Sequence, residues 1–449
     1  MLLSRCIALI ALVLVTSARA EDFAAQADAY ISALVQQNKF SGSVLAAKDG
    51  KPLFRKGYLL ANREWNIPNG PDTRFRLGSI TKQFTATAIL QLAEQGKLKV
   101  DDPISKYYEA SPASWAKVTI HHLLTHSSGI PSYTSMPGFF AKQSRDDRTP
   151  EEIIQLTQDK PLEFEPGSKW NYDNTGYILL GYVVEKASGE KYADYVRTHI
   201  FEPLGMRDTG YDMPVDIVPH RAAGYDVTPK GWRNSPYLAM SLPYAAGSLY
   251  STVDDLLIWD QAIYAGKLLT PESWKRMFTA HIHEYGYGWG VDEQFHHRQI
   301  SHGGGINGFA TFIARFPDDK VTVIALGNTS SSASGQIAKA LAGMLFGEKI
   351  AIPAPKVEVK IDTKLLDRYP GKYQLQPGMV LTVTREGDQL KIQLTGQPKF
   401  PMFPEGNNLF FLKVVDAELE FIAEPGGQAK AVILHQGGAD KEAPRIATP

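Results

Sequence analysis

The tetrapeptide Ser79-Ile80-Thr81-Lys82 heads a long stretch whose apolar residues recur at helical spacing, and it organises the rest of the chain. Three residues of separation on a helix place both side chains on one face. A serine beside an amine becomes nucleophilic if the lysine is desolvated enough to be partly neutral. Taken alone, however, the tetrad is better explained by a helix N-cap serine followed by a surface lysine.

The same pattern occurs twice more, at Ser114 to Lys117 and at Ser188 to Lys191. The third copy contains Gly189, which is typical of a helix C-terminus, and the second follows a turn-rich segment. Ser79 alone heads a long predicted helix, over residues 79–95, where free backbone N–H groups favour a developing negative charge. Position therefore favours the pair Ser79 and Lys82.

Two further segments contain residues suited to acyl transfer. The only Tyr-x-Asn triplet is Tyr172 to Asn174, in which the phenol can relay protons if nearby cations lower its pKa, and the amide can bind a substrate carbonyl. Taken alone, this triplet is better explained by an ordinary aromatic packing turn.

The second segment is His302 followed by Gly303, Gly304 and Gly305, at the end of a predicted strand. Glycines let a substrate backbone approach, and their N–H groups can serve as oxyanion donors. The segment also fits G-x-G-x-x-G, but strand residues follow it instead of a helix, which disfavours a dinucleotide site. A tight turn with a hydrogen-bonded histidine is the alternative.

Several classes of function are disfavoured. His122 and His126 are spaced i, i+4, but without H-E-x-x-H or a nearby acidic cluster they predict packing and turn roles, so no metal site is expected. No G-x-S-x-G occurs, which argues against an α/β-hydrolase. Lysine and arginine total 47 against 48 acids, which gives no electrostatic case for nucleic acid. We expect neither a metal nor an organic cofactor.

Residues 1–20 have the features of a signal peptide, with Arg5, an apolar core from Cys6 to Val15, and Ala18-Arg19-Ala20 as cleavage site. An uncleaved N-terminal anchor is the alternative. Cys6 is the only cysteine, so the mature chain would have no disulfide, catalytic cysteine or thiolate metal site. We expect a periplasmic or secreted protein with no membrane span after cleavage.

The remaining pattern predicts an α+β fold. A first helix is expected over residues 23–40, and strands are expected over 43–48, 53–59, 298–302, 309–316 and 321–326, with a closing helix over 334–346. Strands near both ends predict one five-stranded antiparallel sheet flanked by helices. The middle, residues 100–285, would be a largely helical insertion, with a cleft between it and the sheet.

A proline-rich joint at residues 351–355 precedes a change of composition. Six short alternating runs then predict a small antiparallel β barrel. The expected organisation is a signal peptide over 1–20, a hydrolase domain over 21–350, a linker over 351–365 and a β domain over 366–449.

Taken together, these segments resemble the serine β-lactamase and penicillin-recognising enzyme superfamily. The similarity is greatest to its class C-like branch, which includes D,D-carboxypeptidases, D-aminopeptidases and family VIII esterases. The resemblance covers roughly residues 25–348, and residues 366 onward resemble a lipocalin-like β domain that opens with Tyr369 to Tyr373. Further matching stretches are Arg76 to Ser79, His122 to Pro131, Pro203 to Met206 and Ala246 to Thr252.

The resemblance implies a role for each residue of the predicted site. Ser79 would be the acylated nucleophile and Lys82 its proton partner. Tyr172 would move protons to the leaving group and from the deacylating water, and Asn174 would hold the substrate amide.

His302, Gly303 and Gly304 fall on the strand motif that is K-T-G in this family. The backbone N–H groups of Ser79 and Gly305 would form the oxyanion hole. The family's lysine is a fixed positive charge that grips the carboxylate of penicillins and of C-terminal D-alanine, whereas His302 is expected to be mostly neutral near pH 7. This departure lowers the expectation of an efficient β-lactamase.

The sequence therefore predicts an exported serine hydrolase that acts through an acyl-enzyme on D-amino-acid peptides or small esters. Its partner would be a small-molecule or peptide substrate, with cell-wall fragments among the candidates. A class C-type β-lactamase is the alternative within the enzymes. A penicillin-binding sensor or inactive scaffold is the alternative outside them.

Overall fold

The computed structural model describes residues 21–228, 230–330, 333–376, 378–415, 417–424, 426–436 and 439–446. The expected targeting segment, residues 1–20, lies outside these ranges. The chain forms two compact units, one from residues 21–227 and 232–352 and the other from residues 228–231 and from residue 353 onward. Across the described ranges, no helix combines the length and the apolar character needed to cross a membrane.

The first unit is built on a six-stranded antiparallel sheet with the order β10-β11-β12-β13-β1-β2. The five expected strands are all present, and β10 adds a sixth at the edge. The sequence of β10, GVDEQ, contains two acidic residues and is partly exposed, so no alternating apolar pattern predicts this strand. The strands are β1 Gly42–Lys48, β2 Lys51–Tyr58, β10 Gly290–Gln294, β11 His297–Ile306, β12 Phe309–Phe316 and β13 Val321–Gly327.

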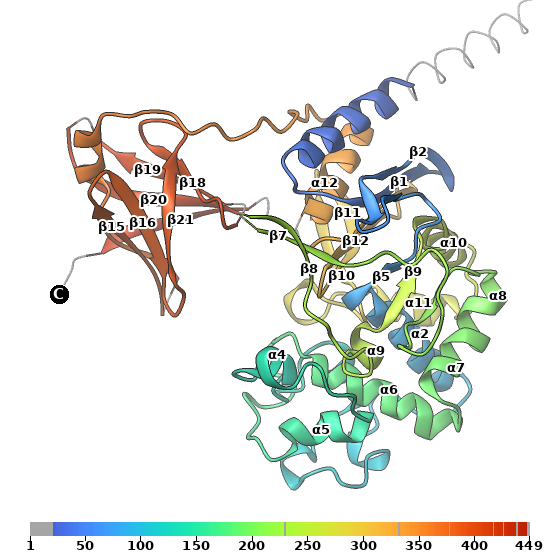
Figure 1. Ribbon diagram of the computed structural model, residues 1–449. Helices are drawn as coiled ribbons and strands as arrows, with labels where there is room; N and C mark the ends of the chain where they lie inside the picture. The colour runs from blue at the N-terminus through green and yellow to red at the C-terminus, as the bar shows by residue number, and fades with distance from the viewer. Residues whose placement is uncertain are drawn as a thin grey trace, which may run out of the picture. The chain divides into compact units, whose positions relative to one another are not determined.

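Alternation along the strands divides the first unit into two cores. In β1, Val44 and Ala46 point to one core, while Leu45 and Ala47 point to the other, as the period of two requires. Residues 21–36, which are helical, and α12, Ala333–Phe346, cover the first face. The helices of the insertion cover the other face (Figure 1).

The insertion between β2 and β10 is largely helical, as expected. Its helices are η1 Gly78–Ile80, α2 Thr81–Glu94, η2 Ile104–Lys106, η3 Ala113–Trp115, α3 Ile120–Leu124, η4 Tyr133–Ser135, α4 Phe139–Lys142, α5 Pro150–Gln158, α6 Asn174–Ser188, α7 Tyr192–Val196, η5 Arg197–Phe201, α8 Glu202–Leu204, α9 Tyr244–Gly247, α10 Val253–Tyr264, α11 Pro271–Met277 and η6 Ile282–Glu284. Its short strands are β3 Leu60–Asn62, β4 Ile67–Pro68, β5 Phe75–Arg76, β6 Gly210–Tyr211, β7 Tyr225–Thr228, β8 Gly231–Asn234 and β9 Leu249–Ser251.

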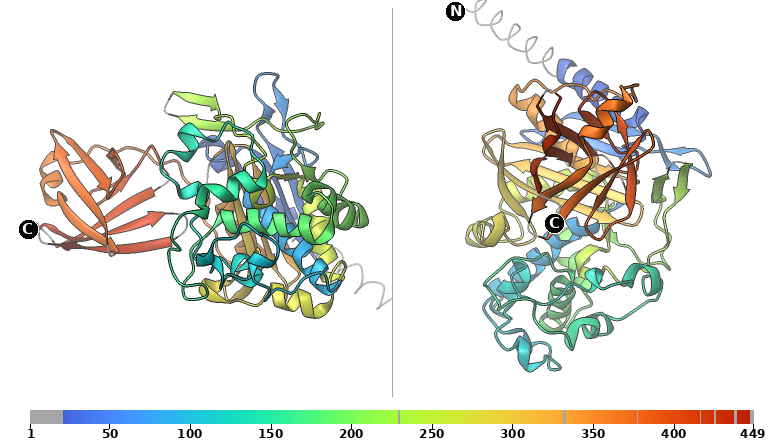
Figure 2. Two further views of the ribbon diagram at one scale, coloured as in Figure 1. Left: turned by 90° about the horizontal axis from the view of Figure 1, so that it is seen from below. Right: turned by 90° about the vertical axis from the view of Figure 1, so that its left-hand side faces the viewer.

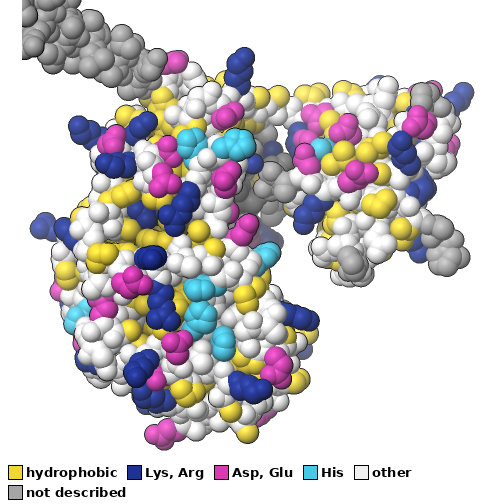
Figure 3. All heavy atoms as spheres, turned by 180° about the vertical axis from the view of Figure 1, so that it is seen from behind, with side chains coloured by type: hydrophobic (Ala, Val, Ile, Leu, Met, Phe, Trp, Pro, Cys, Tyr) yellow, Lys and Arg dark blue, Asp and Glu magenta, His cyan; other side chains and the backbone are white. Residues whose placement is uncertain are grey.

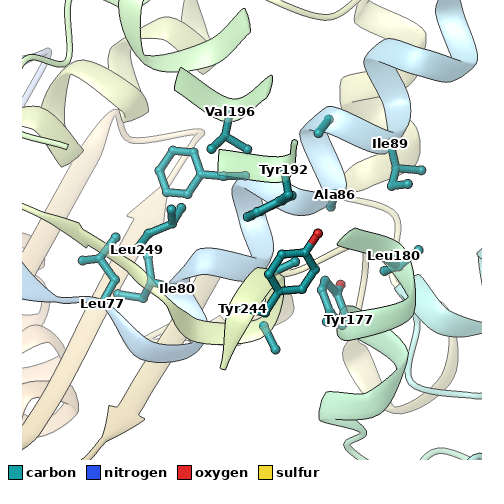
Figure 4. Packing of buried hydrophobic residues seen from close by; sticks show 14 of the residues in the cluster. Leu77, Ile80, Ala86, Ile89, Tyr177, Leu180, Tyr192, Val196, Tyr244 and Leu249 are labelled. Atoms are coloured by element: carbon teal, nitrogen blue, oxygen red, sulfur yellow. The ribbon is translucent and has the colours of Figure 1, made fainter. Parts of the chain in front are cut away.

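Buried side chains from several of these elements meet beneath η1 and the start of α2 (Figure 4). Leu77 and Ile80 pack there with Leu249 of β9, and Tyr177 of α6 lies close to Tyr244 of α9. This packing holds α2 between the sheet and α6, so the residues at the start of both helices are fixed relative to each other.

The second unit is a closed barrel of eight antiparallel strands, drawn in orange to red in Figures 1 and 2. Its core is filled by apolar side chains that include Tyr369, Tyr373, Phe410 and Phe421. After η7, Thr363–Arg368, the strands are β14 Gly371–Gln376, β15 Met379–Glu386, β16 Gln389–Leu394, β17 Lys399–Pro404, β18 Leu409–Phe411, β19 Ala417–Ala423, β20 Ala429–Gln436 and β21 Ala439–Ile446.

The expected barrel is confirmed, but two of its strands were not predicted. β17 contains Pro401 and Pro404, and β21 contains Pro444 among charged residues. Proline lacks the backbone donor of a strand, so both segments show turn signals in the sequence. Closure of the barrel supplies the pairing that their own sequences do not favour.

Candidate active site

Ser79 lies in the single turn η1, directly before α2, and it is half-buried. The turn depends on Gly78, whose φ is +56°. A β-carbon at Gly78 would lie 3.0 Å from the backbone nitrogen of Gly305, which is tighter than side chains normally allow. The glycine therefore brings the backbone at Ser79 close to β11.

Lys82 is fully buried one turn further along, with 0% of its surface exposed. Its Nζ lies 3.2 Å from Ser79 Oγ, 2.8 Å from Asn174 Oδ1 and 3.0 Å from the carbonyl oxygen of Ala246. A neutral amine has two hydrogens and one lone pair. Because two carbonyl oxygens accept the hydrogens, the lone pair is left for the hydroxyl of Ser79.

The surroundings of Lys82 favour this neutral form. Burial lowers the pKa of Lys82 to about 7, and the negative charge of Asp173 opposes that shift. The two rival tetrads lack such an environment. The side chain of Lys117 is 80% exposed beside Glu165, and that of Lys191 is 77% exposed beside Glu185.

Tyr172 completes one side of the site. The centre of its ring lies 4.8 Å from Lys82 Nζ, and its hydroxyl is buried without a hydrogen bond of normal geometry to any described residue. Burial raises the pKa of Tyr172, although the Ser79 hydroxyl acts in the opposite direction. The sequence analysis made proton relay by this phenol depend on nearby cations that lower its pKa. No such lowering is found, so the phenol stays protonated and can donate a proton.

Asn174 begins α6 and is held at both ends of its amide. Its Oδ1 accepts from Lys82, and its Nδ2 donates to Thr134 Oγ1 at 3.0 Å. Its backbone N–H donates to Ser132 Oγ at 3.1 Å. Asn174 therefore orients the amine of Lys82 with its own orientation fixed.

His302 faces the same space from β11 and is 8% exposed. Its Nδ1 lies 2.6 Å from the carbonyl oxygen of Gly303, which can only accept, so Nδ1 carries the proton. Its Nε2 then accepts from the Tyr285 hydroxyl at 2.9 Å. Burial, assisted by the charge of Lys82, lowers the pKa of His302 to about 4, so the ring is neutral near pH 7, as expected.

The glycines after His302 lie against the turn that carries Ser79. β10 pairs with β11 only as far as Ser301, so the next part of that edge is free of a strand partner and packs on η1. A β-carbon at Gly304 would lie 1.9 Å from the carbonyl oxygen of Leu77, whereas one at Gly305 would meet no atom within 4 Å. The turn before Ser79 thus lies against Gly305, and Gly305 itself borders open space.

The sequence predicts packing and turn roles for His126. In the structure this residue holds the Tyr172 loop in place. Its φ is +56°, its Nδ1 accepts the backbone N–H of Asp173 at 3.1 Å, and its ring centre lies 4.3 Å from that of Tyr172. His122 instead accepts the N–H of Thr119 and caps α3. The i, i+4 spacing gave no sign that only one of the pair reaches the site.

Histidine side chains gather on the face shown in Figure 3. The ring of His121 lies 4.8 Å from that of His281 and 5.9 Å from that of His122. His121 Nδ1 lies 2.8 Å from the Tyr287 hydroxyl, so that nitrogen is engaged within the protein. In the described part of the chain, no group of three or more histidine, cysteine or acidic residues is arranged to hold a metal ion.

Asp173, Ser132, Thr134 and Tyr285 were not predicted. Asp173 is the middle residue of the Tyr-x-Asn triplet, where the pattern leaves the residue type open. Ser132 and Thr134 lie at the start of η4 and Tyr285 directly follows η6, and their contacts with the site depend on tertiary folding, so their sequences carried no signal.

Comparison with known proteins places both units among families. The model described as Beta-lactamase matches residues 27–345, and the model of a domain of unknown function, DUF3471, matches residues 355–444. Penicillin-binding protein 4* of Bacillus subtilis is 33% identical over 92% of this chain and 96% of its own length. Esterase EstB of Burkholderia gladioli is 32% identical over 57% of this chain and 73% of its own.

Solved structures show the same similarity. The crystal structure of a D-stereospecific amidohydrolase from Streptomyces sp. superposes with a TM-score of 0.60 at 28% identity. The alignment covers 72% of this chain and 99% of that one.

Proposed function

The chain belongs to the β-lactamase family and is a serine hydrolase of that family, and on this premise we propose that it cleaves D-amino-acid peptides or small esters through an acyl-enzyme at Ser79. We propose further that it does so after export. The Lys82 amine carries this proposal, because two carbonyl oxygens take its hydrogens and leave its lone pair for the Ser79 hydroxyl.

Acylation begins when the Ser79 oxygen attacks the substrate carbonyl carbon and its proton passes to the neutral Lys82. The carbonyl oxygen becomes negative and accepts hydrogen bonds from the N–H groups of Ser79 and Gly305. The bond to the leaving group then breaks as the Tyr172 phenol protonates it, and the proton held by Lys82 returns to the phenol oxygen. The result is a serine ester, a released alcohol or amine, and a neutral lysine.

Deacylation repeats these proton movements with water. A water molecule attacks the ester carbonyl carbon, and the Tyr172 phenol oxygen takes one proton from it while passing its own proton to the neutral Lys82. Lys82 then returns that proton to the Ser79 oxygen as the acid leaves, so the lysine is neutral again. Tyr172 suits the donor step because burial keeps it protonated.

The neutral His302 supports a substrate without a carboxylate on the leaving-group side. Both ring nitrogens are engaged, with Gly303 and with Tyr285, and burial lowers the pKa of His302. A site of this kind offers no fixed charge where penicillins and C-terminal D-alanine carry theirs. The similarity to an esterase and to a D-stereospecific amidohydrolase agrees with this preference.

The mechanism is tested by mapping the site of acylation. Incubation with a fluorophosphonate and, separately, with benzylpenicillin, followed by intact-mass measurement and peptide mapping, should place an adduct on Ser79. Ser79→Ala should lose it, and Ser114→Ala should retain it, because the Lys117 beside Ser114 is exposed. An unmodified Ser79 with both probes would rule the mechanism out.

Substrate class is tested by turnover of p-nitrophenyl esters, D-alanyl peptide amides and nitrocefin side by side. We expect the esters and amides to be turned over faster than nitrocefin. A reversed order would identify a β-lactamase, and stable adducts without turnover would identify a penicillin-binding sensor.

A further inference from the structure

We propose that Asp173 is a positioning residue of this site, the counter-charge of Lys82 and the residue that fixes Tyr172 and Asn174 on either side of it. This inference rests on the proposed acyl-enzyme function. Tyr-x-Asn leaves the middle position open, so the role belongs to the particular residue in this chain.

Three hydrogen bonds anchor Asp173, which is 3% exposed. As the N-cap of α6, its Oδ2 accepts the backbone N–H of Gly176 at 3.0 Å and the hydroxyl of Ser128 at 3.2 Å. Its own N–H donates to His126 Nδ1 at 3.1 Å. The backbone between Tyr172 and Asn174 is therefore tied to the segment that follows α3.

The capping bonds use only one of the two carboxylate oxygens. Asp173 Oδ1 is buried and makes no hydrogen bond of normal geometry with the described residues. A neutral asparagine or serine would cap the helix equally well, whereas burying a carboxylate carries a large desolvation cost. Burial raises the pKa of Asp173 to about 7, so the carboxyl is partly ionised near neutral pH, and this charge needs an explanation beyond capping.

Lys82 provides that explanation. Asp173 and Lys82 act on each other electrostatically, so that each favours the charged form of the other against the effect of burial. Asn174, the next residue after Asp173, binds the amine directly. The charge of Asp173 limits how far burial can neutralise the lysine.

The other groups facing Lys82 do not supply a negative charge. His126 and His302 are neutral, because burial lowers the pKa of each. Tyr172 and Tyr177 are protonated, because burial raises the pKa of each. The neutral partners are Ser79 from η1, Asn174 from α6 and the Ala246 carbonyl from α9.

Asp173→Asn tests the charge with little change in shape. The amide oxygen keeps the bonds to Gly176 and Ser128, and the amide nitrogen replaces the oxygen that has no hydrogen bond. Without the negative charge the Lys82 ammonium is less favoured, so the neutral amine persists to lower pH. The acid limb of Ser79 labelling by a fluorophosphonate should move to lower pH by about one unit.

Asp255→Asn is the matched control. Asp255 is also buried, burial also raises its pKa, and its carboxylate accepts from Asp208 N–H and from Thr209 Oγ1, away from the site. This variant should keep the wild-type pH profile. Asp173→Ser, which retains a cap without charge, should show the same shift as Asp173→Asn and serves if the asparagine variant does not fold.

The outcomes separate this inference from the proposed function. An unlabelled wild-type Ser79 would refute the acyl-enzyme itself. Labelling with an unchanged acid limb in the folded Asp173 variants, or a limb moved to higher pH, would show that Asp173 is only a helix cap. An equal shift in Asp255→Asn would show that the effect is a general one of removing a buried carboxylate.

Discussion

At the scale of single residues, the site is defined by where hydrogens are placed. Lys82 gives its hydrogens to Asn174 and Ala246, and His302 is tied to Gly303 and Tyr285. These arrangements support two proposed roles, a base at Lys82 and a neutral ring at His302. The S-x-x-K tetrad suggested the role of Lys82. For His302, the sequence indicated only that a fixed positive charge is replaced by a mostly neutral ring.

Acylation should depend on pH through Lys82. The amine is the base only when neutral, and burial lowers its pKa to about 7. The rate of Ser79 labelling should therefore rise as pH increases through about 7 and fall as pH decreases below it. Labelling measured from pH 5 to 11 checks this, and a midpoint near the ordinary lysine value of about 10.4 would contradict it.

His126 should be replaceable by asparagine but not by alanine. Alanine removes the acceptor of the buried Asp173 N–H and must adopt φ near +56°, so it should destabilise the fold by about 2 kcal/mol or more. Asparagine tolerates that φ and offers an oxygen in place of Nδ1. Thermal unfolding of both variants measures the difference. Equal melting temperatures would contradict the role of His126 in holding the Tyr172 loop.

At the scale of elements, the site lies where η1, the start of α6 and the free edge of β11 meet. The sequence placed Ser79 at the head of a helix and His302 on a strand, because helix and strand periodicity is local, and it placed Tyr172 only on a loop. It could not place His126 or Tyr285, since their contacts are formed by packing between distant segments. For the same reason the sequence did not predict β10, β17 and β21. These segments become strands by pairing with their neighbours, and their own sequence patterns do not indicate a strand.

An added methyl group should destabilise the protein at Gly304 but not at Gly305. Gly304→Ala would drive β11 from η1, because its β-carbon meets the Leu77 carbonyl at 1.9 Å and Thr311 Oγ1 at 2.4 Å. We expect a loss of about 2 kcal/mol or more in stability and loss of Ser79 labelling.

Gly305→Ala is the control for this pair, because its β-carbon meets no atom within 4 Å. It should unfold at the wild-type temperature. Melting curves and fluorophosphonate labelling decide the comparison, and similar stability for the two variants would contradict the tight contact between β11 and η1.

At the scale of the whole molecule, the chain is two units with separate cores joined by an exposed segment. Residues 356–359 are bound to the second unit, through Lys356 to Glu418 and through the N–H of Val359 to Pro404. The preceding residues from 348 form no helix or strand. The boundary between the units was visible in sequence because prolines accumulate there.

Trypsin should first cut the full chain after Lys349, which is exposed, and leave two folded fragments. Lys356 should be cut more slowly, because its side chain is 17% exposed and paired. Mass spectrometry of early digests identifies the site, with Lys349→Gln as control for slower cleavage. A first cut within residues 21–346 would contradict the independence of the first unit.

The pairing of β1 with β13, which joins Gly42 to Gly327, has a consequence for the order of folding. As the ribosome extends the chain, β1 and β2 are made first, yet β1 has an unpaired apolar edge until nearly the whole unit has been synthesised. Such long-range pairing is slow to form. The nascent chain therefore remains open until residues 321–327 emerge, and a chain that stops earlier has no partner for its first strand.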